Sequence, residues 1–89
     1  MHRTVNHFAT PDFWDLYHRL SPATRDLADR CFALLRADPN HPSLHFKRVG
    51  RYWSARVGRK HRVLAVEQAE GLIWFWIGRH EEYERLLRL

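Results

Sequence analysis

The sequence predicts a single α+β domain, in which a helical hairpin packs on a four- to five-stranded antiparallel sheet and a short helix ends the chain. Two observations indicate this class. Apolar residues recur at helical spacing before residue 38 and at strand spacing after residue 43. The expected strands are joined by short turns, which indicate antiparallel neighbours. With 89 residues, 45% of them hydrophobic, the chain suffices for one such domain over residues 1–89 and is too short for two.

The first half of the chain carries the same helix start signal twice. Residues 5–8 are expected to form a short strand, after which Thr10-Pro11 supplies a capping hydroxyl and a first-turn proline. This first helix should last about two to three turns. Ser21-Pro22 repeats the signal, and the second helix should run to about Ala37, where turn-forming residues follow.

The second half of the chain is expected to form most of the sheet. The segment LIWFWI, residues 72–77, is apolar on both faces, so it should be the strand at the centre of the core. Gly78 is expected to end that strand, and a last short helix should cover residues 79–88. The four predicted strands are residues 44–49, 52–57, 62–66 and 72–77.

Positive charge is concentrated in one part of the chain. The net charge is +5, yet residues 39–66 contain no Asp or Glu. Most cations in this segment are arginines, and aromatic residues lie between them on the predicted strands, which is typical of a surface that binds a polyanion. The cations of the segment are Lys47, Arg48, Arg51, Arg56, Arg59, Lys60 and Arg62.

The cysteine and histidine content argues against a bound metal. The single Cys31 excludes an internal disulfide and a cysteine-based zinc site, and it favours a reducing compartment. His41 and His45 are four residues apart, but they fall on an expected turn and strand, where this spacing does not bring them to one helical face. No metal or other cofactor is therefore expected. No segment approaches the roughly 20 apolar residues of a membrane span or resembles a signal peptide, so we expect a cytoplasmic protein.

Two arginines are expected to face one another on the hairpin WSARVGRKHR. If residues 58–60 form a three-residue loop, Arg56 lies directly opposite Arg62 and both side chains share one face of the sheet. Like charges in this position destabilise a sheet, so an anionic ligand explains the pair better than folding does. A phosphate suits the planar donors of arginine and gains charge in a transition state. The alternative is that one arginine bends into solvent or pairs with Glu81 or Glu82.

A second group of candidates lies in the segment GRHEEYERLL. Arg79, His80 and Tyr83 are expected to converge on the ligand of the hairpin, because this segment leaves the sheet beside it. His80 can accept and donate a proton near neutral pH, as cleavage of a phosphodiester by a ribose 2′-hydroxyl requires. Tyr83 can stack on a base or donate a proton as a catalytic residue, although its helical spacing to Leu86 and Leu87 equally fits a core residue. An ordinary surface histidine at a helix start is the alternative for His80.

The order of these segments resembles the RelE/ParE superfamily of bacterial type II toxin–antitoxin toxins. The resemblance covers nearly the whole chain and is carried by the Arg-Val-Gly turn leading to His-Arg-Val-Leu, and by the Gly-x-His-x-x-Tyr ending after an aromatic strand. It implies a compact α+β toxin that a partner antitoxin neutralises by masking the basic face. An acidic partner would suit the charge of this chain.

In the RelE-like branch, the resemblance implies ribosome-dependent, metal-free cleavage of messenger RNA by attack of the 2′-hydroxyl. Arg62 would then bind the scissile phosphate, Arg56 would be a basic residue of the preceding strand, and Tyr83 the aromatic residue near the C-terminus. Arg79 or His80 would take the late basic or acid/base position. The backbone of messenger or ribosomal RNA would be contacted by Lys47, Arg48 and Arg51, with Arg59, Lys60, His61 and Arg79 as further nucleic-acid-binding candidates.

Two other functions stay open at this point. The ParE-like branch shares the fold and inhibits DNA gyrase without cleaving anything, and a third possibility is an inactive relative that only binds its antitoxin. The two hairpin arginines together with His80 favour the ribonuclease, because gyrase binding has no evident need for a titrating histidine beside a phosphate site. The sequence contains no clear carboxylate base, and it leaves open codon preference, the identity of the antitoxin and any larger toxin–antitoxin assembly.

Overall fold

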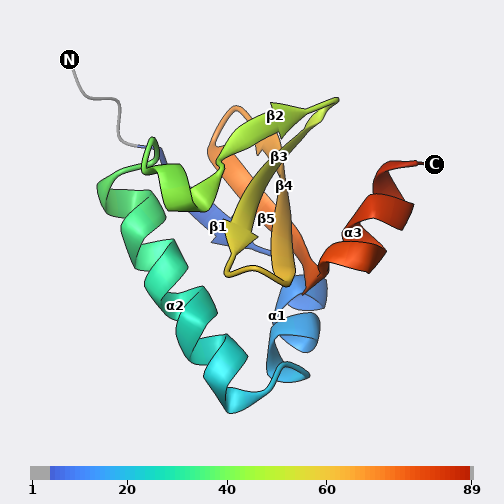
Figure 1. Ribbon diagram of the computed structural model, residues 1–89. Helices are drawn as coiled ribbons and strands as arrows, with labels where there is room; N and C mark the ends of the chain where they lie inside the picture. The colour runs from blue at the N-terminus through green and yellow to red at the C-terminus, as the bar shows by residue number, and fades with distance from the viewer. Residues whose placement is uncertain (1–4, 89) are drawn as a thin grey trace.

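The computed structural model describes residues 5–88, which form a five-stranded sheet with helices on both of its faces (Figure 1). The strand order is β1-β5-β4-β3-β2. The α+β class predicted from the sequence is therefore confirmed. In chain order the elements are β1 (His7–Ala9), α1 (Pro11–His18), α2 (Pro22–Ala37), the 3₁₀ helix η1 (Pro42–Leu44), β2 (Lys47–Val49), β3 (Tyr52–Val57), β4 (His61–Gln68), β5 (Gly71–Arg79) and α3 (His80–Leu87).

Both long helices begin where the capping signals predicted. The Thr10 hydroxyl accepts a hydrogen bond from the Phe13 amide at 3.1 Å, and the Ser21 hydroxyl accepts one from the Thr24 amide at 3.2 Å. In each helix a proline occupies the first turn, where its missing N–H costs nothing. The second helix ends at Ala37, as expected.

The sheet is antiparallel except at one edge. Strands β2 to β5 pair as consecutive antiparallel neighbours, whereas β1 runs parallel to β5, with Phe8 opposite Ile73. Backbone hydrogen bonds hold both ends of this pairing, from the Leu72 amide to the Asn6 carbonyl and from the Thr10 amide to the Trp74 carbonyl. No short turn joins β1 to β5, so no local pattern could predict their relative direction.

One sheet face packs against the helical hairpin and forms the core. α1 lies against β5 and α2 against β3, and the buried side chains of this face include Trp74, Ile77 and Val57 together with Leu35 of α2. The central place of the aromatic strand β5, between β1 and β4, matches the sequence prediction. Within residues 5–88 no helix is long and apolar enough to cross a membrane.

Several predicted strand limits are wrong, and two of the differences bear on the site. The strand expected from residue 44 begins only at Lys47, because Leu44 ends η1 and is buried in the core, and His45 then takes a left-handed conformation with φ of 45°. The strand expected to end at Gly78 continues to Arg79, and α3 begins at His80. Gly78 serves packing rather than termination, since a Cβ atom there would lie 2.5 Å from the ring of Trp76.

Candidate functional site

The β3–β4 hairpin has the register that the sequence predicted. Residues 58–60 form the turn, Val57 pairs with His61, and Arg56 lies directly opposite Arg62. Gly58 makes this turn with φ of +64°, a conformation that glycine adopts without strain. Directly opposed residues of an antiparallel pair share a face, and Val57 is buried against the helices. The two arginines therefore lie on the face opposite the helical hairpin.

Neither arginine has an acidic partner among the described residues. The Nε atom of Arg56 donates to the Gly58 carbonyl at 3.0 Å, and an Nη atom of Arg62 donates to the His61 carbonyl at 2.8 Å. The ion pairs found in residues 5–88 involve neither of them, so the predicted alternative of a pair with Glu81 or Glu82 is not seen. Burial, and then the nearby charge of Arg56, lower the pKa of Arg62 from its usual value. The pair is thus a partly buried concentration of positive charge with no directly paired carboxylate among the described residues.

The start of α3 is attached to this hairpin. The His80 amide donates to the Lys60 carbonyl at 2.8 Å, and Gly78, two residues before His80, pairs with Arg62. The His80 ring stacks on Tyr83, with 5.9 Å between ring centroids, and Tyr83 is buried. Tyr83 lies close enough to Arg62 to act on its charge. The structure therefore brings three of the predicted residues, Arg62, His80 and Tyr83, to one end of the sheet with Arg56.

Two predicted residues lie on the other face. His61 pairs with Val57 on one side and with Arg79 on the other, so the register directs both His61 and Arg79 toward the helix-covered face. Burial, followed by the charge of Arg79, lowers the pKa of His61. The expected convergence of Arg79 with His80 and Tyr83 is wrong, because β5 continues through Gly78 and its side chains keep alternating.

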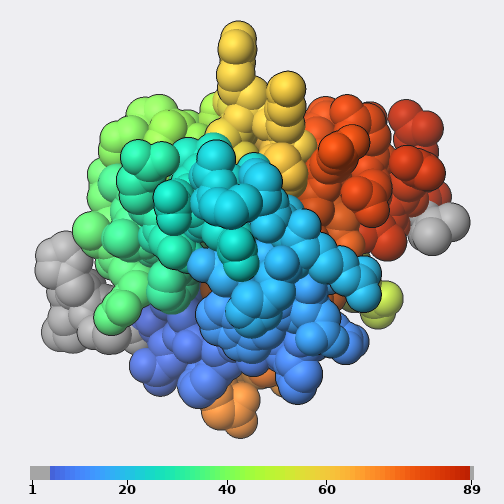
Figure 2. Space-filling view, turned by 90° about the horizontal axis from the view of Figure 1, so that it is seen from below, coloured from blue at the N-terminus to red at the C-terminus, as the bar shows by residue number. Residues whose placement is uncertain are grey.

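The remaining basic candidates are exposed but spread over several surfaces. Lys47 pairs with Ser54 and shares the face of the arginine pair, whereas Arg48 pairs with Trp53 on the opposite face. The Arg51 guanidinium lies over the Tyr52 ring, 5.4 Å from its centroid. Arg59 and Lys60 are in the β3–β4 turn, which projects from the surface (Figure 2, yellow). Of these candidates, only Lys47 extends the face of the arginine pair along the sheet.

Two residues at the site escaped prediction. His45 reaches Arg56, with its Nε2 atom 3.5 Å from an Nη atom of the guanidinium, because the left-handed turn after η1 redirects the chain. No pattern in the sequence predicts this left-handed conformation of His45. The second is Glu84, whose Oε1 atom lies 3.3 Å from the Nε2 atom of His80. Their spacing of four residues on a helix was a readable signal for this contact.

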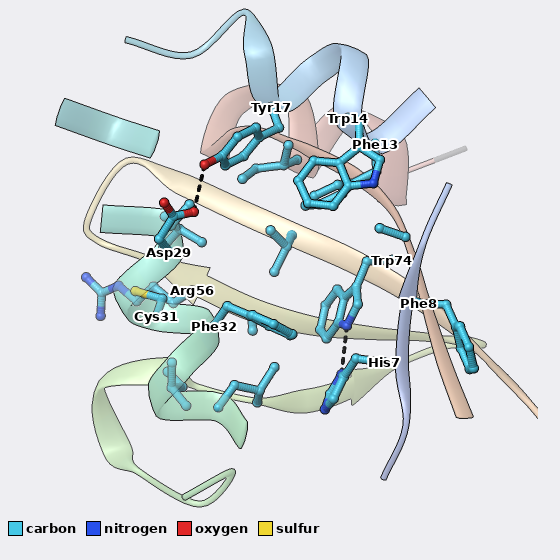
Figure 3. A pocket seen from close by; sticks show the side chains of 18 residues that line it. His7, Phe8, Phe13, Trp14, Tyr17, Asp29, Cys31, Phe32, Arg56 and Trp74 are labelled. Carbon is cyan, nitrogen blue, oxygen red and sulfur yellow. Dashed lines mark hydrogen bonds between the residues drawn. The ribbon is translucent and has the colours of Figure 1, made fainter. Parts of the chain in front are cut away.

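A separate apolar groove lies between the helices and the sheet (Figure 3). It encloses about 260 Å³, and its rim includes two large side chains that stay exposed, Trp14 (47%) and Phe32 (41%). The ring of Phe8, in β1, points away from the groove. At its floor, the Trp74 indole N–H donates to the Nδ1 atom of His7 at 3.0 Å. Burial, and then the charge of Arg36, lower the pKa of His7. Arg56 also contributes to the lining, but its side chain belongs to the opposite sheet face, so the groove and the arginine pair lie on different faces of the sheet.

Comparison with known proteins agrees with this geometry. The family model of the ParE-like toxin domain matches residues 22–85, most of the chain. The chain belongs to this family. The resemblance to RelE/ParE toxins inferred from the sequence is therefore confirmed. No curated protein sequence matches the toxin domain.

Solved structures share the fold of this toxin domain at low sequence identity. The RelB–RelE antitoxin–toxin complex from Methanococcus jannaschii contains a chain with a TM-score of 0.68 and 11% identity, over 89% of this chain and 96% of that chain. A YoeB/ParE toxin from Agrobacterium tumefaciens has a TM-score of 0.65 and 18% identity, over 85% of this chain and 99% of that chain. YafQ from E. coli has a TM-score of 0.66 and 11% identity, over 89% of this chain and 97% of that chain. The toxin domain thus has a RelE-like fold over nearly its whole length.

Proposed function

We propose that this toxin domain is an endoribonuclease that cleaves messenger RNA on the ribosome. The observation that supports it most is the opposed pair of Arg56 and Arg62, which has no acidic partner among the described residues. The pair lies at the end of the sheet where His80 begins α3. A sheet gains nothing from two guanidinium groups at this spacing, whereas a phosphodiester neutralises both. Arginine also keeps its charge throughout the pH range of a cell.

Each residue of the site has a distinct role in this proposal. Arg62 and Arg56 bind the scissile phosphate and stabilise the negative charge that increases in the transition state. His80 moves a proton at the reacting ribose, and the ring of Tyr83 supports the histidine from below. Lys47 continues the positive surface on the same face and contacts the backbone of the RNA without reading its sequence.

Inhibition of DNA gyrase is the second candidate, because the family model is that of ParE-like toxins. A protein that only binds gyrase has no need for a proton-transferring side chain next to an anion site. Messenger 5′ ends mapped after induction of the protein in cells distinguish the two. In-frame cuts in translated messages support the ribonuclease, and an SOS response with intact messages supports gyrase inhibition.

Two variants connect this test to the site. Arg62→Ala and His80→Ala are expected to abolish both toxicity and cleavage, while Arg48→Ala, on the opposite sheet face, is the matched control for a lost positive charge. Full toxicity of both site variants would contradict the proposed site. If both variants lose toxicity but the wild type leaves messages intact, the site matters for a function other than cleavage.

The partner that we propose for the apolar groove is an antitoxin. Proteins with this fold are known in complexes with antitoxins, among them RelE with RelB and YafQ with DinJ. Trp14 and Phe32 leave apolar surface exposed at the groove, and the net charge of +5 favours an acidic partner.

A further inference from the structure

Glu84 is the carboxylate that the structure places against the candidate proton-transfer residue. Its Oε1 atom lies 3.3 Å from the Nε2 atom of His80, and its other oxygen lies 3.8 Å from an Nη atom of Arg88. Both contacts connect positions i and i+4 on α3. The charge of Glu84 also acts on Arg62 across the site. One carboxylate therefore touches the histidine and influences the phosphate-binding arginine.

Stability alone does not account for this arrangement. The side chains of His80 and Glu84 are 39% and 49% exposed, and an exposed pair at this spacing contributes only weakly to the stability of a helix. A carboxylate near a phosphate site also opposes the binding of the phosphate through repulsion. A negative charge in this place has an unfavourable effect on substrate binding, so its advantage has to lie in a later step.

We propose that Glu84 is a positioning residue for His80 in the cleavage reaction. The carboxylate accepts a hydrogen bond from the Nε2–H group of the neutral imidazole, which fixes the ring and leaves Nδ1 as its proton acceptor. When Nδ1 takes the proton, the carboxylate stabilises the imidazolium that forms. Carboxylate–histidine pairs orient catalytic imidazoles in this way in unrelated enzymes. This inference rests on the proposed ribonuclease function.

The proton and electron movements balance without any further reactant. The 2′-oxygen loses its proton to Nδ1 of His80 and forms a bond to phosphorus, while the bond from phosphorus to the 5′-oxygen breaks. The 5′-oxygen leaves with the electron pair of that bond and takes a proton from water. The resulting hydroxide is neutralised by the imidazolium, which returns His80 to its starting form. The products are a 2′,3′-cyclic phosphate and a 5′-hydroxyl.

A test of this role compares Glu84→Ala and Glu84→Gln with Glu82→Ala, which removes the same charge from an exposed position of the same helix. Cleavage of messenger on programmed ribosomes is measured to separate kcat from KM. Glu84→Ala should lower kcat about 10-fold or more while KM stays equal or falls, because a charge that repels phosphate is gone. Glu84→Gln should retain more activity than Glu84→Ala, since its amide oxygen still accepts from Nε2–H.

A structural role of Glu84 would instead raise KM, because a disordered α3 would weaken RNA binding. A kcat for Glu84→Ala equal to that of Glu82→Ala, or a loss confined to KM, would overturn the inference. If Arg62→Ala and His80→Ala remain active, the proposed function fails; if they are inactive while Glu84→Ala is fully active, this inference alone fails.

A second readout does not depend on activity. Nitrogen-15 NMR of the His80 imidazole in the isolated protein reports which ring nitrogen carries the proton. The wild type should show the Nε2–H form almost exclusively, and Glu84→Ala should show a larger share of the Nδ1–H form. The same tautomer mixture in both proteins would argue against Glu84 as the group that orients the ring.

Discussion

Arg56 and Arg62 face one another directly across the β3–β4 pair, on the sheet face that the helical hairpin does not cover. Each side chain donates one hydrogen bond to a backbone carbonyl, and neither forms an ion pair with a carboxylate among the described residues. Repulsion within this pair is one of the two causes that lower the pKa of Arg62. The hairpin therefore carries an electrostatic cost in the absence of an anion, from which several measurable consequences follow.

The first consequence is a repulsive coupling energy between the two arginines. In a double-mutant cycle of Arg56→Gln and Arg62→Gln, the free energy of unfolding should show a coupling of about 0.5 kcal/mol with the sign of repulsion, as expected for like charges opposite each other in a sheet. Urea unfolding measures it. A cycle of Arg62→Gln with Arg48→Gln, on the other face, should give a coupling near zero. An attractive coupling between Arg56 and Arg62 would contradict the arrangement.

The second consequence is stabilisation by anions. Inorganic phosphate at a few times its dissociation constant should raise the thermal unfolding midpoint by about 4 °C, because it binds the folded site and relieves the repulsion. Arg62→Gln should lose most of this shift, while Arg48→Gln keeps it. Equal shifts in both variants would mean that phosphate acts through general charge screening and not at the arginine pair.

The third prediction concerns acid stability and His7. Burial lowers the pKa of His7 in the folded protein, so the unfolded chain binds the proton more readily. The stability that neutral His7 contributes is thus complete above its ordinary value of 6.5 and is lost as the pH falls below it. Protonated Nδ1 also can no longer accept the hydrogen bond of Trp74.

The variant His7→Gln should therefore show a shallower loss of unfolding free energy between about pH 7 and pH 5 than the wild type. The pKa of His61 is also lowered, so His61 contributes to the same pH dependence. The slope measured for His61→Gln shows how much of the loss comes from His61, and the comparison gives the part that comes from His7. Urea unfolding at a series of pH values measures both. An unchanged slope in His7→Gln would show that the His7–Trp74 contact does not control acid stability.

The fourth prediction concerns the apolar groove. Trp14→Ala should weaken binding of the cognate antitoxin by about 2 kcal/mol, roughly 30-fold in Kd, while cleavage by the free toxin stays unchanged. Leu86→Ala is the control, since Leu86 is similarly exposed (42%) but lies on α3 away from the groove. Isothermal titration calorimetry with the purified antitoxin measures the affinities. An effect of Leu86→Ala as large as that of Trp14→Ala would place the antitoxin elsewhere.

Local signals explain which parts of the fold and site were predictable. The helix starts at Pro11 and Pro22 and the pairing of Arg56 with Arg62 depend on caps and a short turn, so the sequence predicted them correctly. The parallel placement of β1 depends on a contact between distant segments, for which no local pattern exists. The left-handed conformation of His45, which follows the buried Leu44, likewise has no local sequence signal.

The prediction for Arg79 failed for a different reason. Glycine often ends a strand, so Gly78 suggested that Arg79 already belonged to the helix and could turn toward the site. In the structure, the small size of Gly78 makes room for the Trp76 ring, and the strand continues. His80, one residue later, begins α3, so of the two residues expected in this helix near the site only His80 belongs to it.

The most direct test of the central claim is the chemical state of RNA ends after incubation of the purified toxin domain with ribosomes programmed with messenger. Wild-type protein should leave a 2′,3′-cyclic phosphate on one fragment and a 5′-hydroxyl on the other, and Arg62→Ala and His80→Ala should leave the messenger intact. Intact messenger with the wild type, or fragments with 3′-hydroxyl and 5′-phosphate ends, would contradict cleavage by the 2′-hydroxyl at the arginine pair.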